Sequence, residues 1–198
     1  LVVTSATNAG TYSVAYKIDD PNNYEWADGT STIKTVPWII NPYDITTNGS
    51  VGAISEQTYT GSATTPNPTV TELNRTLTKD TDYVLTYKDN VNVGTATAII
   101  LGKGNFKGSK TTTYTIGKKA VDTPTNLAVS TDGIVTWSPS ADATGYQISI
   151  DGNKWTDATS GINYLSTITS ETGTRTVYVR GINSDTANYD PSSNATTS

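Results

Sequence analysis

The segment DDPNNYEWADG gathers acidic and amide side chains whose oxygens could bind calcium. Calcium prefers carboxylate and carbonyl oxygens as ligands, and the three aspartates of this segment are the candidate ligands: Asp19, Asp20 and Asp28. Their spacing does not match the D-x-D-x-D-G calcium loop, so a solvated acidic turn is the simpler interpretation. We therefore expect no metal and no other cofactor, and keep these aspartates only as a weak calcium candidate.

Two tryptophans beside predicted turns, Trp26 and Trp155, could stack on sugar rings. Packing over the end of a β-domain is the simpler interpretation for both, because tryptophan buries a large apolar area. The other two tryptophans, Trp38 and Trp137, are expected in core positions. Trp26 and Trp155 are therefore the candidate ligand-binding residues, with a glycan as the candidate ligand.

The residues needed for most catalytic chemistry are missing. The chain has no His and no Cys, which excludes Ser–His–Asp and Cys–His nucleophile systems and His- or Cys-based zinc sites. The loop GKGNFKG lacks the Lys-Ser/Thr ending of a phosphate-binding loop. A paired-carboxylate glycosidase would need a deep cleft, which small β-domains seldom supply. We expect no enzymatic activity.

Charge and composition narrow the class of protein further. The formal net charge of −5 argues against nucleic acid or insertion into an anionic membrane, and no apolar run approaches the ~18 residues of a membrane span. Hydrophobic residues are 34% and charged residues 16%, and Thr, Asn, Asp and Gly favour strands and turns. The absence of Cys, hence of disulfides, favours an exported bacterial protein, extracellular or on the cell surface.

A sequence repeat organises the first part of the chain, because residues 92–116 reappear in a looser copy from residue 8. The loops differ in length but the order of features is kept, as in related β-domains. The matched pairs are Asn8 with Asn92, Gly10 with Gly94, Thr11 with Thr95, Asn23 with Asn105, Tyr24 with Phe106, Trp38 with Tyr114, and Ile40 with Ile116.

Alternating side chains predict the strands of the repeat. In GTATAIIL, Ala96, Ala98 and Ile100 share one face, and the other face is also fairly apolar, which predicts a central strand. Residues 92–116 are therefore expected to form a hairpin, and YVLTYK before them another strand. Pro66 and Pro68 cannot donate to a ladder, so their segment is expected on a sheet edge.

The segment LTKDTDYVLTYKDNVNVGTATAIILGKGNFKGSKTTTYTI resembles the small immunoglobulin-like repeats of bacterial surface proteins, the MBG type. The residues that fit the repeat pattern are Asp82, Tyr83, Tyr87, Asn90, Gly94, Thr95, Gly102, Gly104, Phe106, Gly108, Tyr114 and Ile116. The resemblance implies a compact β-fold, usually in tandem, and no chemistry. It defines segment 1 (residues 1–41), a partial C-terminal half of a repeat, and segment 2 (residues 42–118), a complete repeat.

Segment 3 (residues 122–198) resembles a bacterial fibronectin type III domain. The resemblance is carried by Pro124, Leu127, Trp137, Tyr146 and the phrase VYVRGIN. It implies a seven-strand sandwich that serves as a spacer, an adhesion surface or an accessory module. Within the segment, alternation places Val135 and Trp137 on one face, and DGN suggests a type I′ turn.

The partial repeat has an expected consequence for segment 1. With Asn8 set on Asn92, Leu1 and Val3 correspond to Leu85 and Tyr87, so the first half of this repeat is absent from the sequence. Such a half-sandwich exposes an apolar face and unpaired strand edges. Residues 1–41 are expected to pair with another chain, to dock on the next domain, or to be poorly ordered.

These observations favour an all-β chain of tandem immunoglobulin-like and fibronectin type III-like sandwiches, arranged end to end. The expected function is that of a non-catalytic spacer in a cell-surface or secreted protein of a Gram-positive bacterium, linking or presenting neighbouring domains. The linkers NPYD and GKKAVDTP are expected to limit bending, because proline stiffens both. The alternative is an adhesin for a host or matrix protein, or a carbohydrate-binding accessory module of an exported hydrolase.

Overall fold

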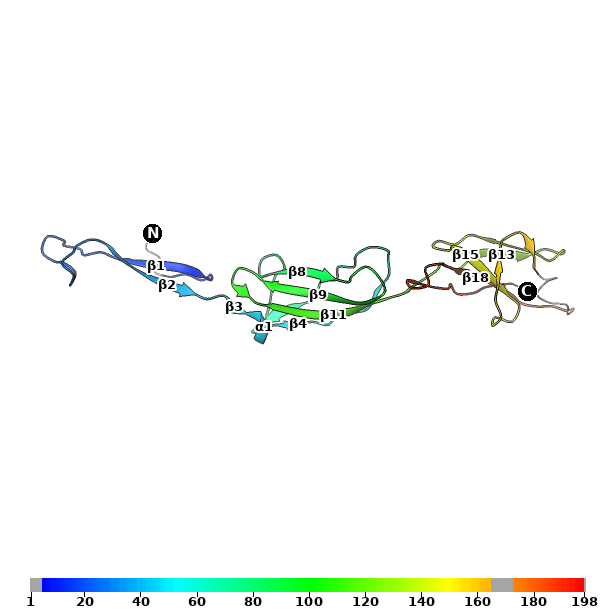
Figure 1. Cartoon of the computed structure of the whole chain (residues 1–198), viewed down its shortest axis with the longest axis horizontal. Coiled ribbons are helices and arrows are strands. Elements are labelled where there is room, and N and C mark those ends of the chain that lie inside the picture. The colour runs from blue at the N-terminus through cyan, green and yellow to red at the C-terminus, as the bar shows by residue number, and fades with distance from the viewer. Residues whose placement is uncertain (1–4, 165–172, 198) are drawn as a thin grey trace. The chain divides into compact units, whose positions relative to one another are not determined.

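The computed structural model describes residues 5–164 and 173–197 and is nearly all β (Figure 1). This confirms the all-β class expected from the sequence. Among the described residues the one α-helix, α1 (Ile45–Asn48), is a single turn that begins where the Asp44 carboxylate accepts the Thr46 N–H at 2.9 Å. Within the same residues, no helix has the length and apolar character needed to cross a membrane.

The strands up to residue 117 belong to segments 1 and 2. They are β1 (Gly10–Tyr16), β2 (Lys34–Ile40), β3 (Tyr43–Asp44), β4 (Ser50–Val51), β5 (Gln57–Thr58), β6 (Val70–Glu72), β7 (Arg75–Thr76), β8 (Tyr83–Lys88), β9 (Gly94–Gly102), β10 (Phe106–Lys107) and β11 (Ser109–Gly117).

The remaining strands follow in the linker and in segment 3. They are β12 (Lys119–Ala120), β13 (Thr125–Val129), β14 (Ile134–Ser138), β15 (Gly145–Ser149), β16 (Thr156–Ala158), β17 (Ile162–Asn163), β18 (Val177–Ile182), β19 (Tyr189–Asp190) and β20 (Ala195–Thr197).

The chain divides into two compact units whose bounds differ from the three segments. The first unit comprises Leu1–Ile54, Thr65–Lys88 and Thr97–Tyr114, and the second comprises Ser55–Thr64, Asp89–Ala96 and Thr115–Ser198. The first unit thus holds segment 1 with most of segment 2. The second holds segment 3 with the loops and strand ends of segment 2 that adjoin it in the structure.

Segment 1 is an antiparallel hairpin of β1 and β2, with Gly10 opposite Ile40 and Tyr16 opposite Lys34. Tyr12 and Trp38 face each other across the hairpin, and their rings stack at 4.9 Å between centroids. No residue of β1 or β2 is buried. Leu1 and Val3 lie outside the described residues. The hairpin therefore has ordered pairing but no core of its own.

Segment 2 contains the expected hairpin within a sheet of order β5-β11-β9-β8 (Figure 1). As predicted, β9 is a central strand, with Ala96, Ala98 and Ile100 fully buried on one face. A smaller sheet of order β4-β6-β7 and the two-stranded pair of β3 and β10 also belong to the segment. The buried apolar residues of the first compact unit are Ile45, Val70, Leu77, Tyr83, Leu85, Ala98, Ile100, Phe106 and Tyr114.

Segment 3 is built from two sheets, of order β13-β14-β17 and β16-β15-β18-β20. One hydrophobic cluster joins them, because Val135 and Trp137 come from β14 while Ile148 and Val179 come from β15 and β18. The predicted alternation of β14 is confirmed, since Val135 and Trp137 are buried and Thr136 between them is exposed.

Three local expectations were wrong. Trp38 was expected in a core position but is only half-buried, because the hairpin of segment 1 has no core, whereas Trp137 is buried as expected. The segment containing Pro66 and Pro68 forms no strand, since residues 59–69 lie between β5 and β6 and belong to neither. The physical reason is that the two prolines have no N–H to donate to a ladder. The DGN turn is not type I′, which needs positive φ at two consecutive residues. Only Gly152 has one, at 73°, and the Asp151 carboxylate holds the turn by accepting the Asn153 and Lys154 N–H groups at 2.8 and 2.7 Å.

Candidate functional site: two joints between segments

The aspartates proposed for calcium make separate contacts. Asp20 accepts the Asn22 N–H at 3.2 Å and the Asn23 side-chain amide at 2.7 Å. Asp28 pairs with Lys34, and Asp19 lies 3.4 Å from the Lys17 ammonium. In residues 5–164 and 173–197, no group of three or more His, Cys, Asp or Glu side chains could hold a metal ion. The structure does not bring these carboxylates together.

The candidate tryptophans are both half-buried, and each has a cation over one ring face. The Arg180 guanidinium lies 4.0 Å from the Trp155 ring centroid. It is held in this orientation because two of its N–H groups donate to the Gln147 Oε1. The Lys34 ammonium lies 5.6 Å from the Trp26 ring, and the Trp26 indole N–H donates to the Thr32 carbonyl at 2.7 Å. The Trp155 ring thus lies against Arg180 of strand β18, and the Trp26 ring is held by the segment that leads into β2.

The first joint connects the hairpin of segment 1 to segment 2 through Asn105. The Asn105 Oδ1 accepts the Ala9 N–H at 2.6 Å, and its side-chain amide donates to the Asn8 Oδ1 at 2.9 Å. The Asn105 carbonyl accepts the Tyr43 N–H at 2.8 Å. The linker strand β3 then runs parallel to β10, with Tyr43 opposite Phe106.

The second joint connects segment 2 to segment 3 through Asn188. The Asn188 Oδ1 accepts the Val93 N–H at 3.0 Å, and its carbonyl accepts the Lys119 N–H at 3.0 Å. The linker strand β12 runs parallel to β19, with Lys119 opposite Tyr189. All of these residues belong to the second compact unit.

The two joints use equivalent positions of the sequence repeat. Ala9 and Val93 both follow the matched asparagines at 8 and 92, and Tyr43 and Lys119 both lie five residues after the matched aromatics Trp38 and Tyr114. In each case one asparagine receives a turn N–H on its side chain and a linker N–H on its carbonyl. Each such asparagine precedes an aromatic residue, Phe106 or Tyr189. The joint is therefore itself a repeated structure.

Each linker strand is followed directly by a residue that anchors the linker in the following segment. Ile45 is fully buried, and Val121, at the equivalent position, is 2% exposed. The Val121 N–H donates to the Asp190 carbonyl at 3.0 Å. A Cβ on Gly181 would lie 2.8 Å from the Val121 side chain, so only glycine permits this close approach.

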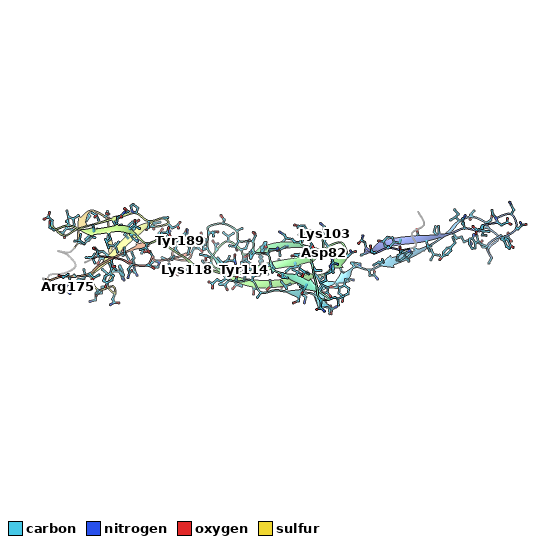
Figure 2. All side chains as sticks on the ribbon, turned by 180° about the vertical axis from the view of Figure 1, so that it is seen from behind. Asp82, Lys103, Tyr114, Lys118, Arg175 and Tyr189 are labelled. Carbon is cyan, nitrogen blue, oxygen red and sulfur yellow. The ribbon has the colours of Figure 1, made fainter. Side chains whose placement is uncertain are left out.

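Charges and rings add contacts at the second joint (Figure 2). The Lys119 ammonium lies 2.5 Å from the Asp142 carboxylate, and this hydrogen bond raises the pKa of Lys119. Lys118 donates to the Thr186 carbonyl at 2.7 Å. The Tyr189 ring packs edge-on against Tyr59 at 5.4 Å, and burial raises the pKa of Tyr189. The joint thus combines backbone pairing with an aromatic contact and ion pairs.

A cleft of about 420 Å³ lies at the first joint, lined in part by Tyr43, Glu72, Asn105 and Phe106. Glu72 is 3% exposed, and within the described residues its carboxylate has no hydrogen-bond partner. Its cross-strand neighbour Arg75 pairs instead with Asp82 at 2.9 Å. Glu72 is the one acid among the lining residues, whereas a paired-carboxylate hydrolase needs two.

Sequence reasoning matched Asn23 with Asn105 but missed Asn188 and the joints. A signal was present, because NNYE, GNFK and ANYD share an asparagine followed by an aromatic residue in all three segments. The linkers were expected to be stiffened by proline, whereas in the structure each also forms a short parallel pair with the segment it leads into.

Comparison with known proteins adds no relative to this picture: no family model matches the chain, and neither a curated protein nor a solved structure matches it.

Proposed function

We propose that the chain is a non-catalytic structural segment of a bacterial cell-surface or secreted protein, which links or presents other domains. In this proposal, segments 1 and 2 are immunoglobulin-like and segment 3 is a fibronectin type III-like sandwich, arranged in tandem. The observation that carries the proposal is the repeated joint, in which Asn105 and Asn188 each receive a turn N–H and a linker N–H.

The joint supports a spacer role because it restrains the hinge between consecutive domains. Domains on flexible linkers reorient freely, so relative motion is the default expectation. Here a linker strand pairs along its length with the following segment, and a side chain holds the preceding turn at a second point. Two separated attachment points oppose both bending and twisting, which is what a spacer needs and what a catalyst does not require.

The location and the absence of catalysis remain part of the same proposal. An acidic chain with no cysteine suits an exported bacterial protein, with a Gram-positive cell surface as the preferred location. The cleft beside Glu72 offers one carboxylate rather than an acid–base pair. Neighbouring domains of the same polypeptide are the partners that this role implies.

Backbone ¹⁵N relaxation of the full chain tests the spacer role. We expect amides of residues 42–118 and of residues 122–164 and 173–197 to report the same overall rotational correlation time, because the second joint couples them. The Asn188→Ala variant is expected to separate the two times. The proposal would be contradicted if the two correlation times stayed equal in Asn188→Ala, or if they already differed in the unmodified chain.

A carbohydrate-binding or adhesive role is the second candidate, and Trp155 is the residue that favours it. Its ring is half-buried, and the Arg180 guanidinium 4.0 Å from its centroid restrains the ring on one face, so a sugar would stack on the other. Glycan-array binding that is lost in Trp155→Ala or Trp26→Ala would favour this role, as would binding to a host or matrix protein. An array without signal leaves the spacer role as the better account.

A further inference from the structure

A third loop of the chain has the local structure of the loop that receives the turn at the second joint. Asp20–Tyr24 reads DPNNY and Asp185–Tyr189 reads DTANY. In both loops the aspartate carbonyl accepts two N–H groups: from Asn23 and Tyr24 at 3.3 and 3.0 Å, and from Asn188 and Tyr189 at 3.2 and 3.0 Å.

The side chains of the two loops correspond as well. The Asn23 side-chain amide donates to the Asp20 Oδ2 at 2.7 Å, and the Asn188 side-chain amide donates to the Asp185 Oδ2 at 2.9 Å. In each case the asparagine side chain is held by its amide nitrogen, which leaves its side-chain oxygen available to accept from another donor. The loop geometry that positions Asn188 is therefore also present around Asn23.

The difference between the loops lies in what their asparagine oxygens accept. The Asn188 Oδ1 and carbonyl accept the Val93 and Lys119 N–H groups. Within the part of the chain that the structure describes, neither oxygen of Asn23 accepts a hydrogen bond. Tyr24 is 68% exposed, whereas Tyr189 is half-buried and packs against Tyr59.

We propose that Asp20–Tyr24 is a docking site for the turn end of one further domain of the same repeat type. The occupant would present two backbone N–H groups, one from an Asn-x-Gly turn to the Asn23 side chain and one from its linker strand to the Asn23 carbonyl. Glu25 occupies the position of Asp190, which lies 3.4 Å from Lys118, so a lysine after the last strand of the occupant is favoured.

A second copy of this chain fits the site poorly. The repeat turns among the described residues are those at Ala9 and Val93, and both N–H groups already donate to an asparagine side chain. A calcium ion fits poorly too, because the Asp20 carboxylate is already used to hold Asn22 and Asn23. The occupant is therefore another repeat domain with a free turn.

A loop exchange in the full chain tests whether the sequence of residues 20–24 can form the joint. The double variant T186P/A187N places DPNNY at the second joint and changes only exposed positions. Hydrogen exchange at the Val93 amide is the readout. We expect a rate within about threefold of the unmodified chain, against an acceleration of at least about tenfold in Asn188→Ala. A double variant that exchanges like Asn188→Ala would overturn the proposal.

Supplying the occupant tests the docking itself. The full chain is extended at its N-terminus by a copy of residues 42–117 followed by a copy of residues 42–84, which continues in repeat register into residue 1. We expect the Val93 amide of the first copy to exchange at least about tenfold more slowly than in the same chain carrying Asn23→Ala. Equal rates, with the amides of the copied β9 protected in both chains, would overturn the proposal.

The inference rests on the proposed spacer role, and the two can fail separately. The original Val93 amide reports the second joint in every extended chain. If Asn23→Ala changes nothing while Asn188→Ala releases the original Val93 amide, docking at Asn23 is wrong and the spacer role stands. If Asn188→Ala has no effect on that amide, the joint and the spacer role fail together. Should the added copies not fold, the loop exchange decides.

Discussion

The hairpin β1–β2 and the hairpin formed by β9 and β11 are two copies of one sequence repeat, and they differ in how far equivalent residues are buried. In the second copy, Ala96, Ala98, Ile100 and Ile116 are fully buried. The corresponding residues of the first copy are at most half-buried: Tyr12, Val14, Tyr16 and Ile40. Similar strands therefore have a core in one place and none in the other, because only the second copy lies in a segment that supplies additional strands.

The first copy, residues 8–40, is called the bare copy because it has no core, and the second, residues 92–116, is called the covered copy. The bare copy differs from the covered copy in its side chains. Its positions hold larger side chains than the alanines of the covered copy, and Tyr12 stacks on Trp38 at 4.9 Å. An aromatic cross-strand pair contributes about 0.2–1 kcal/mol, which cannot replace a buried core. An isolated two-stranded hairpin is marginally stable in water, so the hairpin of segment 1 depends on what it contacts.

The largest expected effect comes from a matched pair of isoleucines. Ile116→Ala removes a fully buried side chain from the covered copy and is expected to destabilise segment 2 by about 2–5 kcal/mol. Ile40→Ala, at the equivalent position of the bare copy, is expected to cost about 1 kcal/mol or less. Urea unfolding followed by NMR measures both changes, with the signals of segment 2 reporting Ile116→Ala and those of segment 1 reporting Ile40→Ala. Equal losses would remove the contrast between the copies.

The next effect concerns the two asparagines of the joints. Asn105→Ala and Asn188→Ala each remove the acceptor of one part-buried turn N–H, and a donor left without its acceptor in this way costs about 1–3 kcal/mol. We expect Asn105→Ala to accelerate exchange of the Ala9 amide and to leave Val93 unchanged, with the reverse for Asn188→Ala. If each variant also accelerated exchange at the other joint, or if neither variant changed any rate, the asparagines would not be the local attachment points.

A similar magnitude with the opposite sign is expected at Glu72, in the segment that covers its hairpin. Its carboxylate is buried without a hydrogen-bond partner in the described structure, and such a group costs about 1–3 kcal/mol. Glu72→Leu is therefore expected to stabilise segment 2 by about 1 kcal/mol. The control is Asp82→Asn, which weakens the pair with Arg75 and is expected to destabilise. Destabilisation by Glu72→Leu would imply that Glu72 has a partner in solution.

The smallest effect is a pH dependence in the bare copy. The hydrogen bond from Lys34 lowers the pKa of Asp28 from 3.8 to about 2. Because the folded pKa is the lower one, the pairing contributes fully above pH 3.8 and is lost as the pH falls through about 2. Carboxyl ¹³C titration measures this shift. Lys34→Met is expected to move the Asp28 midpoint back toward 3.8, and an unmoved midpoint would contradict the assigned cause.

The sequence predicted those parts of the fold that have a two-residue period. Tyr83 and Leu85 are buried and Val84 is exposed, as their alternation indicated, and the same holds for Val135 and Trp137. The joints could not be predicted in this way. Val93 and Asn188 are 95 residues apart, and strands of two residues such as β12 and β19 are too short to show a period. The DGN turn escaped prediction because a side chain, Asp151, determines its backbone conformation.

Residue-resolved hydrogen exchange of the full chain tests the contrast between the copies most directly. The rates of the β9 and β11 amides are compared, position by position in the repeat, with those of β1 and β2. If additional strands rather than the hairpin sequence confer stability, the covered copy exchanges at least about a hundredfold more slowly at hydrogen-bonded positions. Equal protection in the two copies would contradict the account, since the bare hairpin would then be stable on its own.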